Sequence, residues 1–466
     1  MASDYDVIVI GGGHNGIIAA ITLARHGIRV LVIEKTDVLG GLAAGYTARL
    51  PLSRYAYAVG LIPKELAEWI GLFKQDDIVY SEPSWVELTE DGEIGVRWWS
   101  NRERLLEELY EHGAGDVREF FSLIDEFWRC YKRLGLYYTP SPPSRDEALT
   151  LLDGCSPEAA RLLERTSGSI LSEYISMEYW DLFIYPTMYG SNGFALAYYL
   201  QNNGVWGQPR GGMATLTTRL REAAAENGVD ILLGEDVKSL IIENGRVQGV
   251  ITEHGIALTA KAVLYAAPIT GILDLEGSDR LEEHELRAIN ELRTMVFPII
   301  RIDYVTRRKP SPPREEGWRN TPIYVYWTSH GGGEYSYPQI SIGGHHVVQF
   351  SGYLEDPYKL IPPGLDEHDI VSVDVRGPES QISCCRNYTG HPDHIPLIDP
   401  YMFDKRPLEG WGDYRTSIEG LYHGSASSYP GGEINGVAGF NAALRILADL
   451  GIKPDIPFLK EINKRG

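Results

Sequence analysis

A glycine-rich loop followed by an acid is the clearest chemical pattern in the sequence. The loop is residues 11–16 (GGGHNG), and the acid is Glu34. Gly11 permits a tight turn, Gly13 lets the backbone approach a pyrophosphate, and Gly16 permits close packing of a helix on a strand. The Glu34 carboxylate can accept hydrogen bonds from both ribose hydroxyls of an adenosine and would repel a 2′-phosphate. These residue types in this order predict a dinucleotide site.

The elements expected around this loop are those that a dinucleotide needs. Residues 5–10 (YDVIVI) are apolar and rich in β-branched side chains, which is typical of a strand buried on both faces. A helix is expected over residues 17–26 and a second strand over residues 29–33. The sequence therefore predicts a βαβ unit whose helix N-terminus offers free N–H groups and a positive dipole end to an anion.

The residues after Glu34 distinguish between dinucleotides. Lys35 follows directly, and Gly40, Gly41 and Leu42 come a few residues later. An acid followed by a Gly-Gly pair is typical of FAD enzymes of the glutathione-reductase type, in which the glycines let the loop pass close to the cofactor. FAD is therefore favoured over NAD.

Residues 6–41 resemble the FAD-dependent oxidoreductases related to phytoene desaturase, the group of carotenoid desaturases and isomerases. The pair His14-Asn15 inside the glycine loop is familiar in that group, whereas amine oxidases of the same fold usually carry Arg where this chain has Leu42. The resemblance implies an α/β fold. Its parts are a discontinuous Rossmann-type FAD-binding domain and a second α+β substrate domain that contains a mostly antiparallel sheet.

Two later segments resemble the remaining parts of the family's FAD domain. Gly212 precedes a helical stretch and a hairpin that turns at Asn244-Gly245, and Val237 stands where the family's backbone contacts the adenine. The resemblance divides the chain into an FAD-binding domain, residues 1–60, 205–275 and 405–466, and a substrate-binding domain, residues 61–204 and 276–404.

Residues 420–443 resemble the family's closing FAD motif. The resemblance implies that Gly424 approaches the pyrophosphate and ribityl chain, that Gly432 belongs to a Pro-Gly-Gly turn, and that the helix N-terminus near Gly436 and Val437 points at the flavin pyrimidine. A helix N-terminus there would stabilise the negative charge that accumulates when a hydride reaches the flavin.

Glu433 departs from this motif, which usually has a small residue at that position. A carboxylate beside a reduced flavin would oppose the build-up of charge unless it points away or is protonated. No catalytic acid or base is assigned. For His14 and His423, a contact to FAD is expected rather than proton transfer. The histidines of the substrate domain are expected to be structural or exposed; they are His330, His345, His346, His391 and His394.

Local patterns predict further elements. Residues 100–200 read as mainly helical, with capping boxes at Ser100/Glu103 and Ser144/Glu147 and another helix beginning at Ser156-Pro157. Four strands are expected between residues 297 and 353, and the Pro and Gly clusters at 308–317 and 331–333 are expected to be loops.

Composition excludes several classes of protein. With 43 Lys+Arg against 64 Asp+Glu, the 466-residue chain has a net charge of -21, which repels nucleic acid and anionic lipid surfaces. No apolar run is long enough to span a membrane and no signal peptide is evident, so a cytoplasmic protein is expected, with transient membrane contact still open. The four cysteines are predicted to be reduced and structural, and no metal site is expected.

The predicted reaction is hydride transfer from an apolar or alicyclic small molecule to flavin N5, with reoxidation by oxygen, a quinone or another acceptor. Residues 174–206 are dense in aromatic side chains, and Tyr exceeds Phe 28 to 11, which suits a cyclic or partly oxygenated substrate. Two alternatives remain. One is an amine or amino-acid oxidase on the same fold, and the other is a lipid-binding protein like the Rab GDP-dissociation inhibitors. The oligomeric state is left open.

Overall fold

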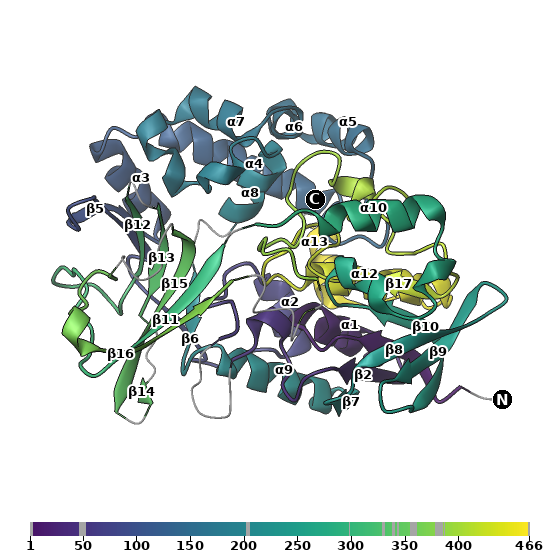
Figure 1. Cartoon of the computed structure of the whole chain (residues 1–466). Helices are drawn as coiled ribbons and strands as arrows, with labels where there is room; N and C mark the ends of the chain where they lie inside the picture. The colour runs from purple at the N-terminus through teal and green to yellow at the C-terminus, as the bar shows by residue number, and fades with distance from the viewer. Residues whose placement is uncertain are drawn as a thin grey trace.

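Two large sheets and a helical layer make up the molecule (Figure 1). The computed structural model describes residues 3–45, 53–201, 206–297, 299–328, 331–337, 341–342, 344–354, 361–377, 385 and 387–464. In Figure 1 the first sheet lies on the right, the second on the left, and helices α3 to α8 form a layer above them. The predicted α/β class with a second, mostly antiparallel sheet is confirmed.

The first sheet is built on five parallel strands. Their order is β7 (Asp230–Leu233), β2 (Val30–Glu34), β1 (Tyr5–Ile10), β10 (Ala257–Tyr265) and β17 (Leu421–His423). An antiparallel hairpin continues from the start of β10 and consists of β8 (Val237–Glu243) and β9 (Arg246–Thr252). Segments that are far apart in the sequence therefore share one sheet, while the exact domain boundaries stay a prediction.

Strand β1 is buried on both faces, as its continuous apolar run predicts. Val7 and Val9 pack with helix α1 (His14–Ala24), whereas Ile8 and Ile10 pack toward the β8–β9 hairpin. Helix α1 begins three residues before its expected start at residue 17, because the glycine loop turns directly into it. The predicted βαβ unit is present.

Helices cover both faces of this sheet. Helix α12 (Val437–Asp449) packs against α1 so closely that a Cβ on Gly439 would lie 2.0 Å from the carbonyl oxygen of Asn15. Helix α9 (Ala214–Glu226) also packs on α1. On the other face, α10 (Glu283–Arg293) contributes Ile289 and Leu292 to the core.

The second sheet is mostly antiparallel. Its order is β16 (Ile370–Arg376), β11 (Ile300–Thr306), β15 (His345–Leu354), β13 (Gly331–Ser336), β12 (Ile323–Thr328), β4 (Trp85–Leu88) and β5 (Ile94–Trp98), with β14 (Ser341–Ile342) paired to β15. Only the β12–β4 pair among these is parallel. A separate pair joins β3 (Ile78–Tyr80) to β6 (Gly207–Pro209).

One loop prediction in this sheet is wrong. Residues 331–333 were expected to form a loop because three glycines stand together, but they begin strand β13. A Cβ on Gly332 would lie 2.2 Å from the carbonyl oxygen of Tyr326, and one on Gly333 would lie 2.2 Å from that of Ser351. The glycines therefore allow close approach of the two neighbouring strands rather than a turn. Residues 308–317 contain no helix or strand, as expected.

The helical layer confirms the prediction for residues 100–200. It contains α3 (Arg102–Glu111), α4 (Val117–Arg133), α5 (Arg145–Cys155), α6 (Pro157–Glu164), α7 (Ser167–Tyr174) and α8 (Gly193–Leu200). The Ser144/Glu147 capping box is present, but the one predicted at Ser100/Glu103 is not. Asn101 caps α3 instead, with its side chain accepting from the backbone N–H of Arg104, because an Asx side chain caps as well as a serine. Two further helices are α2 (Lys64–Ile70) and α13 (Pro457–Lys464).

The cysteine prediction is also wrong in part. Cys130 and Cys155 form a disulfide, with their Cα atoms 6.0 Å apart. Helices α4 and α5 pack together, and this contact brings the two residues within bonding reach although they are 25 positions apart in sequence. Cys384 lies outside the described residues. Among the described helices, none combines the length and the apolarity needed to cross a membrane.

Candidate functional site

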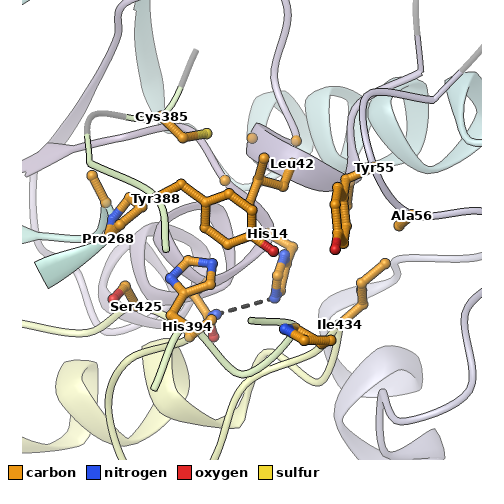
Figure 2. A pocket seen from close by; sticks show the side chains of 18 of the residues that line it. His14, Leu42, Tyr55, Ala56, Pro268, Cys385, Tyr388, His394, Ser425 and Ile434 are labelled. Atoms are coloured by element: carbon orange, nitrogen blue, oxygen red, sulfur yellow. Dashed lines mark hydrogen bonds between the residues drawn. The ribbon is translucent and has the colours of Figure 1, made fainter. Parts of the chain in front are cut away.

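A long cavity lies between the edge of the first sheet and the inner face of the second. The empty space is about 1630 Å³ when the open solvent at the mouth is included. Residues from both sheets line it, and Figure 2 shows His14, Tyr55, Tyr388 and His394 around a common space. The cavity can therefore hold a large ligand, or two smaller molecules next to each other.

The first sheet contributes the carboxyl ends of its parallel strands. Gly11 follows β1, Glu34 ends β2, Ala266 follows β10, and Ser425 comes shortly after β17; all four line the cavity. Parallel strands bring these ends to one edge of the sheet. In open α/β sheets this edge is where ligands bind.

The three glycines of the loop have three different surroundings. Gly11 has a φ of +105°, and a Cβ there would meet the backbone of Ala266 at 3.3 Å. A Cβ on Gly16 would lie 2.1 Å from the carbonyl oxygen of Gly11, so this glycine serves helix-on-strand packing. A Cβ on Gly13 would meet nothing within 4 Å, because that side of the residue faces the cavity. Space for a close-lying anion therefore exists at Gly13.

Glu34 is buried at the cavity wall. Its Oε2 accepts a hydrogen bond from the backbone N–H of Gly12 at 2.7 Å, and its Oε1 accepts from the N–H and the hydroxyl of Thr36 at 3.0 and 2.8 Å. Oε1 thus accepts two bonds, whereas Oε2 accepts one and has a second lone pair left. The side chain is thus held in place by the loop that it faces, and it keeps capacity to accept bonds from a ligand.

Most of the residues predicted to bind the cofactor come together at this cavity. Eleven of the seventeen line it: Gly11, Gly13, His14, Asn15, Glu34, Lys35, Gly40, Gly41, Leu42, Val237 and Glu433. Six lie behind the lining: Gly16, Gly212, Gly424, Gly432, Gly436 and Val437. That these seventeen residues bind the cofactor remains a prediction, for the eleven that line the cavity as for the other six.

The residues behind the lining are in tight packing contacts. A Cβ on Gly424 would lie 2.6 Å from the Cβ of Ala442, and one on Gly436 would lie 2.2 Å from the side chain of Ile18. The first N–H of α12, that of Val437, already donates to the Oδ1 of Asn435 at 2.7 Å. These glycines let elements approach one another around the site, and the end of α12 is partly capped from within the chain.

His14 is a neutral hydrogen-bonding group. Asn15 accepts a bond from the backbone N–H of Gly439 on its Oδ1, at 3.1 Å, so its amide nitrogen is free to donate to the Nε2 of His14 at 3.0 Å (Figure 2, dashed). Nε2 therefore acts as the acceptor. Burial lowers the pKa of His14 to about 4, and a hydrogen bond to the backbone of Glu433 opposes part of this shift. His14 links the loop after β1 to the segment before α12.

An aromatic group faces His14 across the cavity. The rings of Tyr55 and Tyr388 meet edge to face with centroids 5.6 Å apart, and the ring of Tyr388 lies 5.3 Å from that of His394. Burial lowers the pKa of His394 to about 3, and the nearby His14 and Arg406 lower it further. Sequence patterns had assigned no functional role to His394 and did not single out Tyr55 or Tyr388.

Behind Glu433 lie a buried acid, Asp393, and a buried arginine, Arg406, that sequence analysis missed. Asp393 accepts hydrogen bonds from the N–H of Gly432 at 3.0 Å and from the hydroxyl of Tyr199 at 2.7 Å. Arg406 is fully buried and donates to the carbonyl oxygens of Asp393 and Ile395 at 3.0 and 2.9 Å. These bonds hold the turn that carries Glu433.

Glu433 itself faces the cavity in a left-handed backbone conformation, with a φ of +59°. Burial raises its pKa well above the ordinary value of a glutamate, and the neighbouring carboxylates of Asp393 and Glu334 raise it further. An acid at this position would not oppose the negative charge of a reduced flavin if it were protonated or pointed away. The raised pKa meets the first of these two conditions.

The second sheet contributes alternate side chains of its inner face. They are Trp327 from β12, Glu334 from β13, and Ser351 and Tyr353 from β15. Tyr335 and Phe350, which alternate with them, point into the core on the other side. Sequence analysis missed all four lining residues, although an acid after three glycines in an otherwise aromatic region was a signal.

Similarity to known proteins agrees with this geometry. The model of the family DAO, FAD dependent oxidoreductase, matches residues 6–431. Among curated relatives, the mouse pyridine nucleotide-disulfide oxidoreductase domain-containing protein 2 is 23% identical over 96% of this chain and 94% of its own length. The carrot prolycopene isomerase is 23% identical over 98% of this chain and 82% of its own. A limonene dehydrogenase polypeptide of Castellaniella defragrans is 22% identical over 96% of this chain and 95% of its own.

A solved structure of a putrescine oxidase variant shares the fold. Its TM-score is 0.61 at 17% identity, over 96% of this chain and 98% of that one. The resemblance to FAD-dependent oxidoreductases of the carotenoid desaturase and isomerase type is confirmed, since the family match covers most of the chain. The chain therefore belongs to the DAO family of FAD-dependent oxidoreductases.

Proposed function

We propose that this chain holds FAD in the cavity and oxidises an apolar or alicyclic substrate by removing hydrogen across a C–C bond. The observation that carries the proposal is the continuity of the cavity. It runs from the glycine loop and Glu34 at the edge of the first sheet to the aromatic inner face of the second. One space therefore joins a dinucleotide-type end to an apolar end.

The residues at the first-sheet end fit the adenosine diphosphate part of FAD. Gly13 leaves room for the pyrophosphate, Glu34 has acceptors for the ribose, and Val237 lies at the wall near Lys35 and Asp236, which pair at 3.3 Å. Gly40–Leu42 and Glu433 would then border the flavin. When bound, FAD would supply an acceptor for one hydride, which carries two electrons; oxygen, a quinone or another acceptor would later remove these electrons.

Charge along the described lining supports this orientation. Four acidic or basic residues gather at the first-sheet end: Glu34, Lys35, Glu235 and Asp236. Elsewhere in the lining, burial favours the neutral forms of the histidines and carboxyls, because it lowers the pKa of His14 and His394 and raises the pKa of Glu334 and Glu433. A neutral, aromatic space suits an apolar substrate. No catalytic base is assigned among the described residues, so the flavin would accept the hydride and the accompanying proton would pass to water at the mouth of the cavity.

The test begins with the flavin. Purified protein is expected to be yellow and to release FAD on denaturation; colourless protein that fails to bind added FAD would refute the proposal. The flavin of the loaded protein should then be bleached anaerobically by some members of a panel of terpenoid and alicyclic hydrocarbons and ketones. Mass spectrometry of the product should show the loss of two hydrogens.

Oxidation of an amine is the second candidate, because the putrescine oxidase structure shares the fold. Leu42 after the glycine pair disfavours amine oxidation, since amine oxidases of this fold usually have Arg at that position. Hydrogen peroxide production from a panel of amines, with no bleaching by the neutral compounds, would favour this candidate instead. A lipid-binding protein without redox chemistry, the third alternative, should show no flavin spectrum to bleach by photoreduction.

A further inference from the structure

A smaller, aromatic cavity opens beside the main one. Four residues line both cavities and form the neck between them: Tyr185, Trp206, Trp327 and Glu334. We call the smaller cavity the aromatic chamber. Its own walls come from β4, β5, β12 and the segment before α8, and they are mainly apolar: Trp85, Trp98, Leu182, Phe183, Ile184 and Val325.

Aromatic rings form a large part of the chamber wall. Trp85 and Trp98 stack with centroids 4.7 Å apart, and Phe183 meets Trp98 edge to face at 5.4 Å. Asp181 is the second acid in the lining besides Glu334, but its carboxylate accepts a hydrogen bond from the hydroxyl of Tyr189, outside the chamber. Such walls fit the ring system of an apolar molecule.

Glu334 is the polar group at the neck. Its strand pairs it with Val325 on one side and Ser351 on the other, and Tyr185 reaches it from the segment before α8. The Tyr185 hydroxyl donates to its Oε1 at 2.7 Å. No residue in the described part of the chain donates to or accepts from its Oε2. One oxygen is thus fixed by the protein, while the other remains for a ligand.

We propose that the aromatic chamber takes the ring of an apolar substrate that carries one ketone or hydroxyl oxygen, and that Glu334 at the neck donates a hydrogen bond to that oxygen. This inference rests on the proposed function and narrows its substrate class. The ring would enter the chamber, and the oxygenated carbon would lie at the neck, beside the cavity that is proposed to hold the flavin. Glu334 is then a specificity-determining residue.

The protonation of Glu334 agrees with a donor role. Burial raises its pKa to about 8, so the carboxyl is neutral at pH 7. The titratable groups that face it are Tyr185 and Glu433, with Asp181 farther along the chamber wall; Val325 and Ser351 on the flanking strands are uncharged. No lysine or arginine lines the chamber among the described residues. Below its pKa the group donates, and above it only accepts.

Three ligands with one ring skeleton test the proposal. They are α-tetralone, tetralin and 1-aminotetralin, which carry a ketone, no polar group and an amine. Binding to the FAD-loaded protein is measured by calorimetry and by the change in the flavin spectrum. At pH 7 the ketone is expected to bind about tenfold more tightly than the hydrocarbon, the size of one well-made hydrogen bond. Equal binding of the two, or tightest binding of the amine, would overturn the proposal.

Substitutions assign the effect to Glu334. Glu334→Gln keeps a donor that does not titrate, so it should keep the preference for the ketone at every pH. In the wild type the preference should fall as pH rises through about 8, where the carboxyl loses its proton. Glu334→Leu should remove the preference while tetralin still binds. A preference that survives in the leucine variant would rule out the role given to Glu334.

A matched control and a second readout keep the two proposals separate. Glu87→Gln makes the same change in a partly buried acid that lines neither cavity. Glu87 lies on β4, which β12 separates from the strand of Glu334, and the variant should leave the preference intact. If the protein holds no FAD, the proposed function fails, but calorimetry still tests the chamber, because its walls belong to the second sheet and the helical layer. If FAD binds and the ketone shows no preference, only this inference fails.

Discussion

The two sheets meet the same cavity in different ways. The first sheet presents its edge, so the cavity is bordered there by turns, glycines and backbone groups such as those at Gly11, Gly13 and Ala266. The second sheet presents its face, so the cavity is bordered there by alternate side chains such as Trp327 and Glu334. Backbone groups at a sheet edge suit a ligand that does not change, such as a cofactor. Side chains on a sheet face suit a ligand that differs from one enzyme to the next, such as a substrate.

The edge and the face also differ in how well they tolerate amino-acid substitutions. At the edge, a side chain added to a glycine either collides with the protein or fills the ligand space, so few substitutions are compatible with both folding and binding. On the face, each side chain projects from a regular strand, so its replacement changes the cavity without moving the backbone. Substrate preference is therefore expected to be encoded by the second sheet. Four experiments test this contrast.

The largest effect is expected at the edge. Gly13→Val should abolish retention of FAD, because the side chain would occupy the space left for the pyrophosphate. The backbone of Gly13 has a φ of -65° and a ψ of 167°, which valine adopts, so the variant should fold. Flavin content after gel filtration is the measurement. Gly154→Val, at another glycine with open surroundings, is the control. A fully yellow Gly13 variant would show that the cofactor lies elsewhere.

The next effect concerns the support of Glu433. Arg406→Met should lower the free energy of unfolding by about 3 to 5 kcal/mol, because it leaves several buried carbonyl oxygens without their donor, among them those of Asp393, Ile395 and Pro396. Denaturant titration gives the value. Arg415→Met removes an exposed arginine paired with Asp449 and should cost about 1 kcal/mol or less. Equal costs for the two variants would contradict the structural role of Arg406.

A smaller effect is expected at Glu34. Glu34→Ala should weaken FAD binding by about 1 to 3 kcal/mol, since the ribose hydroxyls and the N–H of Gly12 lose their acceptor. Titration of the flavin-free protein with FAD measures it, and Glu243→Ala, at an exposed acid of the same sheet, serves as the control. Unchanged affinity would argue against the assignment of Glu34 to the ribose.

The smallest effect is a pH dependence. Burial holds the pKa of His394 at about 3, below the 6.5 of an ordinary histidine. As pH falls below 6.5, this side chain therefore becomes protonated in the unfolded chain but stays neutral in the folded one. The folded state therefore loses stability in that range. His394→Asn, which tolerates the φ of +59°, removes this loss.

Relative to the wild type, the free energy of unfolding of His394→Asn should improve by about 0.7 kcal/mol between pH 7 and pH 6. The raised pKa values of Glu334, Glu433 and Asp393 act in the opposite direction, but they are present in both proteins and cancel in the difference. The same substitution at the exposed His112 is the control. No relative change would mean that His394 is already protonated in the folded protein at pH 6.

Local patterns predicted much of this fold. The βαβ unit, the Asn244-Gly245 hairpin and the Ser144/Glu147 cap are confirmed, because each depends on residues that are close in sequence. Predictions that ignored distant neighbours were wrong. The glycines at 331–333 form a strand because the strands on either side approach them, and Cys130 and Cys155 are joined because two helices pack together.

By itself, the sequence determined the dinucleotide-type edge and the acidic, FAD-oxidoreductase character of the chain. A turn that must lie against a large ligand requires glycines at fixed spacing, and that requirement is local. Only the tertiary structure decided the rest of the cavity. It placed Tyr185, Glu334 and Glu433, which come from three separate parts of the chain, around one space and buried them together. Burial and mutual proximity set the protonation of such groups, and neither can be read from the order of residues.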